Sequence, residues 1–148
     1  MLFRSVTFDH VNNQYMIVWE EQIDDFEFDI VGGLFDTNLN LIKNVQIADG
    51  SSTECYLYPA VGFCEENERF LVTYNGGTQA KPRRGNVYGK IYDESGNLKA
   101  STIVKQGFFV RTDVAPYLST AFLVSFNGGG NIWGRFLSSE DGDRKSVV

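Results

Sequence analysis

Tyr15-Met16-Ile17-Val18-Trp19 is the first of three apolar runs in this chain that end in an aromatic residue. Phe70-Leu71-Val72-Thr73-Tyr74 and Phe122-Leu123-Val124-Ser125-Phe126 repeat it after 55 and then 52 residues. Each run is followed by a second one that contains a glycine, at 29–32, 86–89 and 131–134. A period of about 50 residues indicates stacked supersecondary units, each built on the same plan.

The composition favours strands over helices. The 148-residue chain has the length of one domain, with 14% aromatic residues, 15 Gly and 3 Pro. This enrichment is typical of all-β proteins. No stretch keeps a 3.6-residue apolar period, so little helix is expected.

Net charge and hydropathy exclude two classes of partner. The formal net charge is −6, whereas nucleic-acid binding and attraction to anionic membrane surfaces both require a basic surface. No apolar stretch reaches the length that spans a membrane. Residues 1–5 lack the apolar core of a signal peptide, so none is expected within this chain.

Each copy divides into four short apolar segments. The expected strands are 5–9, 15–20, 29–36 and 41–48, then 59–64, 70–74, 86–93 and 98–104, then 112–117, 122–127, 131–137 and 144–148. Turn-forming residues at 36–40, 93–97 and 138–143 predict hairpins between the third and fourth strands. Four strands in meander order make a propeller blade, so the sequence predicts blades at 1–53, 54–108 and 109–148.

The second copy carries a resemblance to a known repeat. Asn86-Val87-Tyr88-Gly89-Lys90-Ile91-Tyr92-Asp93-Glu94-Ser95-Gly96-Asn97 follows the apolar run 70–74. It resembles a propeller blade repeat of large bacterial and archaeal surface proteins of the hemolysin-like and adhesin-like class. In copy one, Leu39 replaces the turn glycine. The resemblance implies a propeller fold and an extracellular or cell-surface location, and leaves the function open.

The connectors between the second and third strands differ most between the copies. The connector 20–28 is acidic, 75–85 is basic and rich in glycine, and 127–130 is short. We expect these loops on one face beside the blade crossings 49–53 and 105–111, because variable loops on a regular scaffold are where binding usually occurs. Tyr88 and Trp133 adjoin glycines and are expected to be partly open. The candidate binding residues are therefore Glu21, Asp24, Asp25, Lys81, Arg83, Arg84, Tyr88 and Trp133.

Other chemical motifs in the sequence favour structural roles. Cys55 and Cys64 flank an extended stretch too long for a disulfide unless it bends, so two independent thiols are expected. His10 is the only histidine, is expected in a solvated turn and has no nucleophile context. The acidic turns at 93–97 and 140–143 lack the ligands of a calcium loop, so no metal or cofactor is expected.

Three functions are compatible with these patterns. The favoured one is a non-enzymatic binding or adhesion module for a carbohydrate or protein ligand. The alternatives are a structural segment of a larger propeller, and a propeller glycoside hydrolase that uses loop or inner-strand carboxylates. Because three blades are too few to close a ring, we expect a homodimer that completes a six-bladed propeller.

Overall fold

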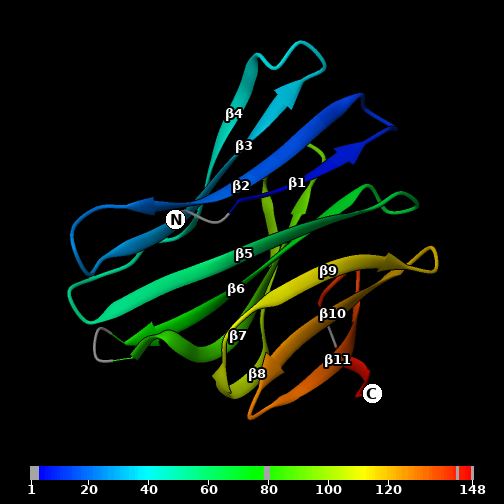
Figure 1. The fold of residues 1–148 in the computed structure, drawn as a ribbon. Helices are drawn as coiled ribbons and strands as arrows, with labels where there is room; N and C mark the ends of the chain where they lie inside the picture. Colours follow the sequence, from blue (N-terminus) through cyan, green and yellow to red (C-terminus); the bar gives the residue numbers. More distant parts are fainter. Residues whose placement is uncertain (1–3, 79–80, 143, 148) are drawn as a thin grey trace.

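The computed structural model of the protein describes residues 4–78, 81–142 and 144–147. These residues form twelve strands and no helix, which confirms the prediction of an all-β, antiparallel protein (Figure 1). The strands are β1 Arg4–Asp9, β2 Gln14–Gln22, β3 Phe28–Asp36, β4 Leu41–Ala48, β5 Glu54–Cys64, β6 Arg69–Thr78, β7 Lys81–Asp93, β8 Leu98–Phe109, β9 Thr112–Tyr117, β10 Ala121–Gly128, β11 Asn131–Ser138 and β12 Arg144–Val147.

The strands pair in chain order into three four-stranded sheets: sheet 1 (β1–β4), sheet 2 (β5–β8) and sheet 3 (β9–β12). All three share one register, in which the aromatic residue that ends each apolar run lies opposite the residue before the glycine. The pairs are Trp19 with Val31, Tyr74 with Tyr88, and Phe126 with Trp133. The sequence repeat is therefore also a repeat of strand pairing.

Sheet 2 is the middle layer and takes part in two hydrophobic cores. One core joins it to sheet 1 around Met16, Val18 and Phe70, and the other joins it to sheet 3 around Leu71 and Phe122. The segment 70–74 is consequently buried on both faces, as its continuous apolar character predicts. In β2 and β10 burial alternates along the strand, because each outer sheet is covered on one face.

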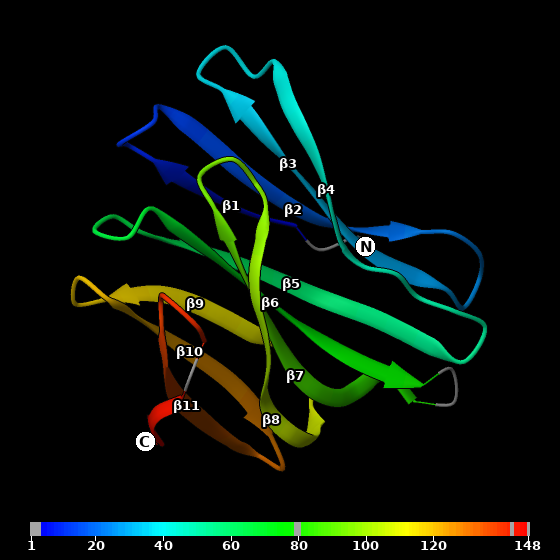
Figure 2. The ribbon, with the colours of Figure 1, turned by 180° about the vertical axis from the view of Figure 1, so that it is seen from behind.

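The first strands of the sheets lie side by side. β5 contacts both β1 and β9, and the later strands of each sheet fan outward from these inner strands (Figures 1 and 2). Gly62 allows the close approach of β5 and β9, because a Cβ there would lie 2.8 Å from Cγ1 of Val114. The sheets are thus packed face to face with their first strands adjacent.

A basic side chain reaches from each later sheet to the sheet before it. The Lys90 ammonium group on β7 donates a hydrogen bond to the Ile47 carbonyl on β4, and Arg135 on β11 donates to the Val104 carbonyl on β8. Burial lowers the pKa of Lys90. Lys90 and Arg135 hold the same place in the repeat, opposite Val72 and Val124, and the corresponding residue of sheet 1, opposite Ile17, is Gly33.

Sheet 2 differs from the predicted strands in its lengths. The flexible loop expected at 75–85 is wrong for most of that segment: β6 continues to Thr78, β7 starts at Lys81, and these two residues pair. β8 likewise runs to Phe109 through the expected crossing, and β5 begins five residues before the expected start at Pro59. Pro59 is tolerated because the ladder is interrupted by a register shift between Leu57 and Ala60.

The hairpin turns after β3 and β7 are built as predicted and are closely alike. In each, the first aspartate, Asp36 or Asp93, accepts hydrogen bonds from two backbone N–H groups and from an asparagine side chain. These bonds, led by the Asn40 side chain, lower the pKa of Asp36. The carboxylates therefore cap turns, as expected from the sequence. The third hairpin extends into residues outside the described part.

The two turns differ at their left-handed residue, and this difference predicts unequal mutational effects. Gly96 (φ 73°) packs against sheet 1, and a Cβ there would lie 3.1 Å from Leu34 Cδ1. Leu39 (φ 63°) is 64% exposed. Gly96→Leu should lower the free energy of unfolding by about 2 kcal/mol through backbone strain and collision. As a control, Leu39→Gly should change it by less than about 1 kcal/mol in urea unfolding; equal effects would contradict the packing of Gly96.

Both cysteines lie within β5 as buried free thiols. Burial, with Glu20 nearby, raises the pKa of Cys55 to about 11, and the Cys64 thiol donates to the Ser119 carbonyl oxygen at 2.9 Å. Their role in the described fold is packing between sheets.

Candidate binding cleft

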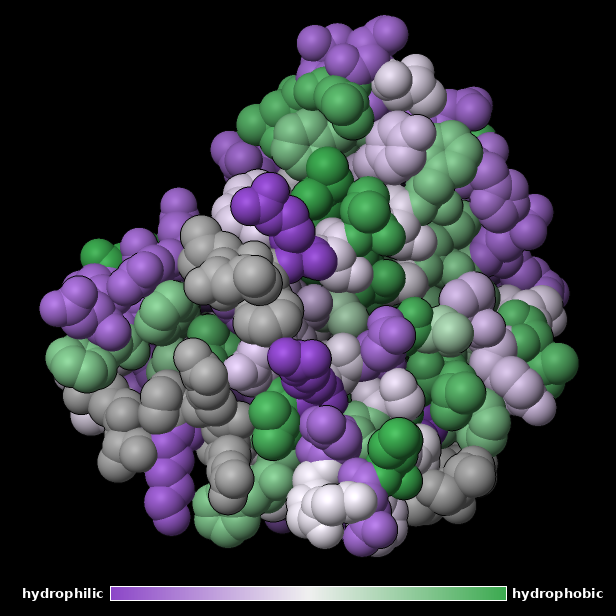
Figure 3. All heavy atoms as spheres, in the orientation of Figure 1, coloured by the Kyte–Doolittle hydropathy of each residue, from purple (hydrophilic) through white to green (hydrophobic). Residues whose placement is uncertain are grey.

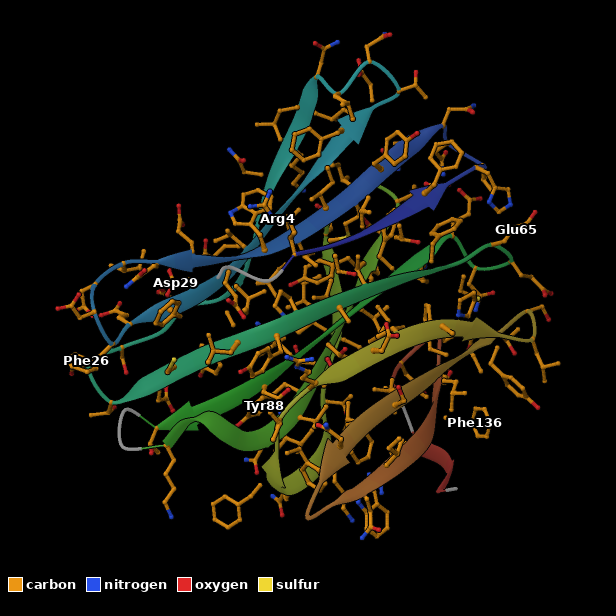
Figure 4. All side chains as sticks on the ribbon, in the orientation of Figure 1. Arg4, Phe26, Asp29, Glu65, Tyr88 and Phe136 are labelled. Atoms are coloured by element: carbon orange, nitrogen blue, oxygen red, sulfur yellow. The ribbon has the colours of Figure 1, made fainter. Side chains whose placement is uncertain are left out.

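The loops that vary between the copies gather at one end of the sheets. The β2–β3 loop, the β4–β5 crossing, the end of β6 with the start of β7, the β8–β9 crossing and the β10–β11 turn follow one another along the left and lower sides of Figure 1. Figure 4 shows Phe26 of the β2–β3 loop at this end and Glu65 of the β5–β6 turn at the opposite end. We call the end that carries Phe26 the crossover end.

Two adjoining cavities open at the crossover end and together form the candidate cleft. The larger, of about 560 Å³, lies between the start of β7, the end of β8 and the β10–β11 turn. The smaller, of about 330 Å³, lies among β5, β6 and β7. Lys81 and Phe108 border both cavities, so one ligand can contact both.

An exposed aromatic ring beneath a cation marks the larger cavity. Phe108 is 67% exposed, and the Lys81 ammonium nitrogen lies 5.5 Å from the centroid of its ring. Gly129 and Gly130 form the β10–β11 turn with φ of 61° and 82°, and a Cβ on either would meet no atom within 4 Å. The turn therefore leaves open space next to the ring, and the exposed residue Asn131 adds an amide.

Tyrosines line the smaller cavity. The Tyr88 and Tyr56 rings meet edge to face at 6.3 Å between centroids, and Tyr88 also stacks on buried Tyr74 at 5.5 Å. Gly76 makes room for them, because a Cβ there would lie 2.5 Å from Tyr88 Cε2. Tyr56 donates to Glu54 Oε2 at 3.2 Å. Burial raises the pKa of Tyr56 to about 12, so its hydroxyl remains a donor at neutral pH.

Two further cations lie near aromatic rings, although neither borders the two cavities. Lys105 lies 5.8 Å from the ring centroid of Trp133, and Arg111 lies 5.8 Å from that of Tyr58. Trp133 is 39% exposed and Tyr88 is half-buried, in line with the partly open positions expected for them. Arg83 and Arg84 belong to β7, and their side chains lie outside the described part of the structure.

The acidic candidates are separate from the cleft. Glu21, Asp24 and Asp25 are exposed at and after the end of β2, and none of them lines either cavity. Asp24 accepts hydrogen bonds from the N–H groups of Phe26 and Glu27 at 2.8 and 2.7 Å. The structure thus brings Lys81 and Tyr88 together and places the acidic residues elsewhere at the same end.

Several carboxylates are occupied as structural hydrogen-bond acceptors. Glu20, the first residue of the connector expected at 20–28, is 1% exposed on β2 and accepts the Tyr58 N–H at 2.7 Å. Asp9 on β1 accepts bonds from its own turn and from Gln14. Asp113 on β9 is exposed and accepts the N–H of Val114. These contacts fix turns and strand bends.

His10 lies in the β1–β2 turn at the end opposite to the cleft, where its Nε2 is 3.0 Å from Glu65 Oε2. It is exposed, as expected for a solvated turn. Among the residues that the structure describes, no group of three or more His, Cys, Asp or Glu side chains could hold a metal ion.

Sequence reasoning missed Phe108 and Tyr56 as cleft residues. The Phe108-Phe109 pair carried a usable signal, because adjacent residues of a strand point to opposite faces and only one of them can enter a core. Phe109 is 7% exposed and Phe108 is 67% exposed. Tyr56 could not be found, since its place depends on the unexpected length of β5.

Comparison with known proteins places the chain in no family. No protein-family model matches it, and no curated protein is significantly similar to it. No helix in the described part of the chain is long and apolar enough to cross a membrane.

Proposed function

We propose that the chain forms three consecutive blades of a propeller and is a non-enzymatic binding module that holds its ligand in the cleft at the crossover end. The adjacent inner strands β1, β5 and β9, together with the fanned sheets, support the propeller geometry. The single observation that carries the binding function is Phe108, a 67% exposed ring beneath Lys81 in a cavity of about 560 Å³.

The cleft favours an acidic oligosaccharide as its ligand. The apolar face of a sugar ring can cover Phe108, and the Lys81 ammonium group can pair with a carboxylate on the sugar. The hydroxyls of Tyr56 and Tyr88 and the amide of Asn86 supply donors and acceptors along the smaller cavity. Because two cavities share Lys81 and Phe108, the geometry suits a ligand of more than one residue.

A glycan array that holds neutral and carboxylate-bearing oligosaccharides tests this function. Phe108→Ala is expected to weaken binding about tenfold, because it removes apolar contact with the ligand over roughly half of one face of the ring. Lys81→Gln should weaken binding to the acidic glycans only, and this loss should shrink at high salt.

Phe26→Ala is the matched control, since Phe26 is 62% exposed at the same end but lies outside the cleft. It should leave binding unchanged. If no glycan binds, or if Phe26→Ala and Phe108→Ala weaken binding equally, the cleft is not a carbohydrate site. If a protein binds instead and Phe108→Ala weakens that binding, the cleft is a binding site for a protein and not for an oligosaccharide.

A further inference from the structure

The outer face of sheet 1 carries the same side chains that sheet 2 buries. Val6 and Phe8 on β1 are 58% and 39% exposed, whereas the residues at the same repeat positions, Val61 and Phe63 on β5, are both 5% exposed. What covers Val61 and Phe63 is sheet 1 itself. Green apolar surface over β1–β4 is visible in the upper part of Figure 3.

The outer face of sheet 3 also exposes apolar residues whose equivalents in the other two sheets are buried. Ile132 is 84% exposed, although its equivalents Ile30 and Val87 are fully buried. Leu123 and Phe136, four residues further along the same face, are half-buried, and their equivalents are among the core residues. Those equivalents are Met16 and Leu34 in sheet 1, and Leu71 and Ile91 in sheet 2.

The two open faces are complementary. Within the chain, each contact between neighbouring sheets joins two different faces. The face that carries Ile30 in sheet 1 and Val87 in sheet 2 is here called the leading face. The face that carries Val61 in sheet 2 is called the trailing face. Sheet 3 leaves a leading face open and sheet 1 leaves a trailing face open. A second copy of this chain supplies both partners at once.

We propose that two copies of the chain associate head to tail, with sheet 3 of each copy packed on sheet 1 of the other, so that six sheets close a ring. The internal contacts between sheets are the template for this interface. The proposal rests on the two sheet faces and not on the cleft or its ligand. Ile132 belongs to both surfaces, since it also borders the larger cavity, whereas Val6 and Leu123 border neither cavity.

Gly33 marks one difference between the proposed contact and its internal template. At the two internal contacts, Lys90 and Arg135 reach back to a carbonyl of the preceding sheet. Gly33 holds that position on the open face of sheet 1, where a Cβ would lie 2.8 Å from the Phe35 ring and 2.9 Å from Leu41 Cδ1. The proposed contact therefore buries no cation from this position.

The molar mass in solution tests the ring. Light scattering at micromolar concentration should give about 33 kDa, twice the 16.7 kDa of one chain. Val6→Glu and Ile132→Glu should each weaken association at least about a hundredfold, because each ring interface would then bury an unpaired carboxylate. Leu98→Glu is the matched control: Leu98 is 52% exposed at the outer edge of the middle sheet, and this variant should remain a dimer.

Each outcome separates the ring from other assemblies. Contact of sheet 1 with sheet 1 would respond to Val6→Glu alone, and contact of sheet 3 with sheet 3 would respond to Ile132→Glu alone; either result overturns the proposal. A wild-type monomer, or a mass above two chains, also overturns it. Circular dichroism of each variant checks that loss of mass reflects dissociation of folded chains. Glycan binding by a monomer would leave the proposed binding function standing and remove only the ring.

Discussion

Replacing Phe70 by alanine is expected to lower the free energy of unfolding by about 3–5 kcal/mol, the usual loss for a large aromatic side chain deleted from a core. Phe70 is fully buried between sheets 1 and 2 and lies 5.0 Å, centroid to centroid, from the ring of Phe63. A loss of that size is a large share of the stability of a single domain. Urea unfolding followed by circular dichroism measures it.

Tyr15 provides an internal control for this prediction. It holds the position of Phe70 in the first repeat, but it lies half-buried on the outer face of sheet 1. In the monomer, Tyr15→Ala should cost only about 1 kcal/mol, and under conditions where two copies associate its cost should rise toward that of Phe70→Ala. Equal losses in a proven monomer would contradict the difference in burial between the sheets.

The second large effect is expected at Glu20. Glu20→Ala should lower the free energy of unfolding by about 3 kcal/mol, because it removes a buried charged acceptor that the Tyr58 N–H donates to. Tyr58 has a φ of 57° and sits where the β5–β6 ladder shifts its register. Glu20 thus holds a strained strand bend. Thermal or urea unfolding of the variant measures the loss.

Two variants separate the hydrogen bond from the charge. Glu20→Gln keeps an oxygen acceptor for Tyr58 and should recover most of the lost stability. Glu21→Ala removes a carboxylate from the exposed neighbour and should change stability by less than about 0.5 kcal/mol. A Glu21→Ala effect as large as that of Glu20→Ala would mean that net charge, and not the bond to Tyr58, determines the result.

The repeat made the strand order and pairing accessible from sequence alone. The aromatic ends of the apolar runs and the glycines after them predicted the strands, and the aspartate turns predicted two of the hairpins. These signals are local: they depend on side-chain alternation and on backbone conformations that Asp, Asn and Gly adopt readily. They needed no knowledge of the neighbouring sheets.

The errors arose where long-range contacts override local preference. Glycines at 76, 77 and 85 and Pro82 favour a loop, yet strands β5 and β8 supply hydrogen-bond partners on both sides and extend the ladder. The burial of Glu20 could not be predicted, because its partner Tyr58 lies 38 residues away. The cleft was predicted in part, through Lys81 and Tyr88, whereas its aromatic wall depends on β8 reaching as far as Phe108.

Because the two faces of each sheet differ, the row of sheets has a polarity, like a polymer whose two ends are distinct. Each sheet contacts the sheet before it through its trailing face and the sheet after it through its leading face, so sheets can be added in one order only. Duplication of a segment of about 50 residues can lengthen such a row of sheets, because the added sheet uses the same contact between leading and trailing faces. Growth then ends only when curvature brings the last unit back to the first, and an array that is too flat to close would continue as a fibre.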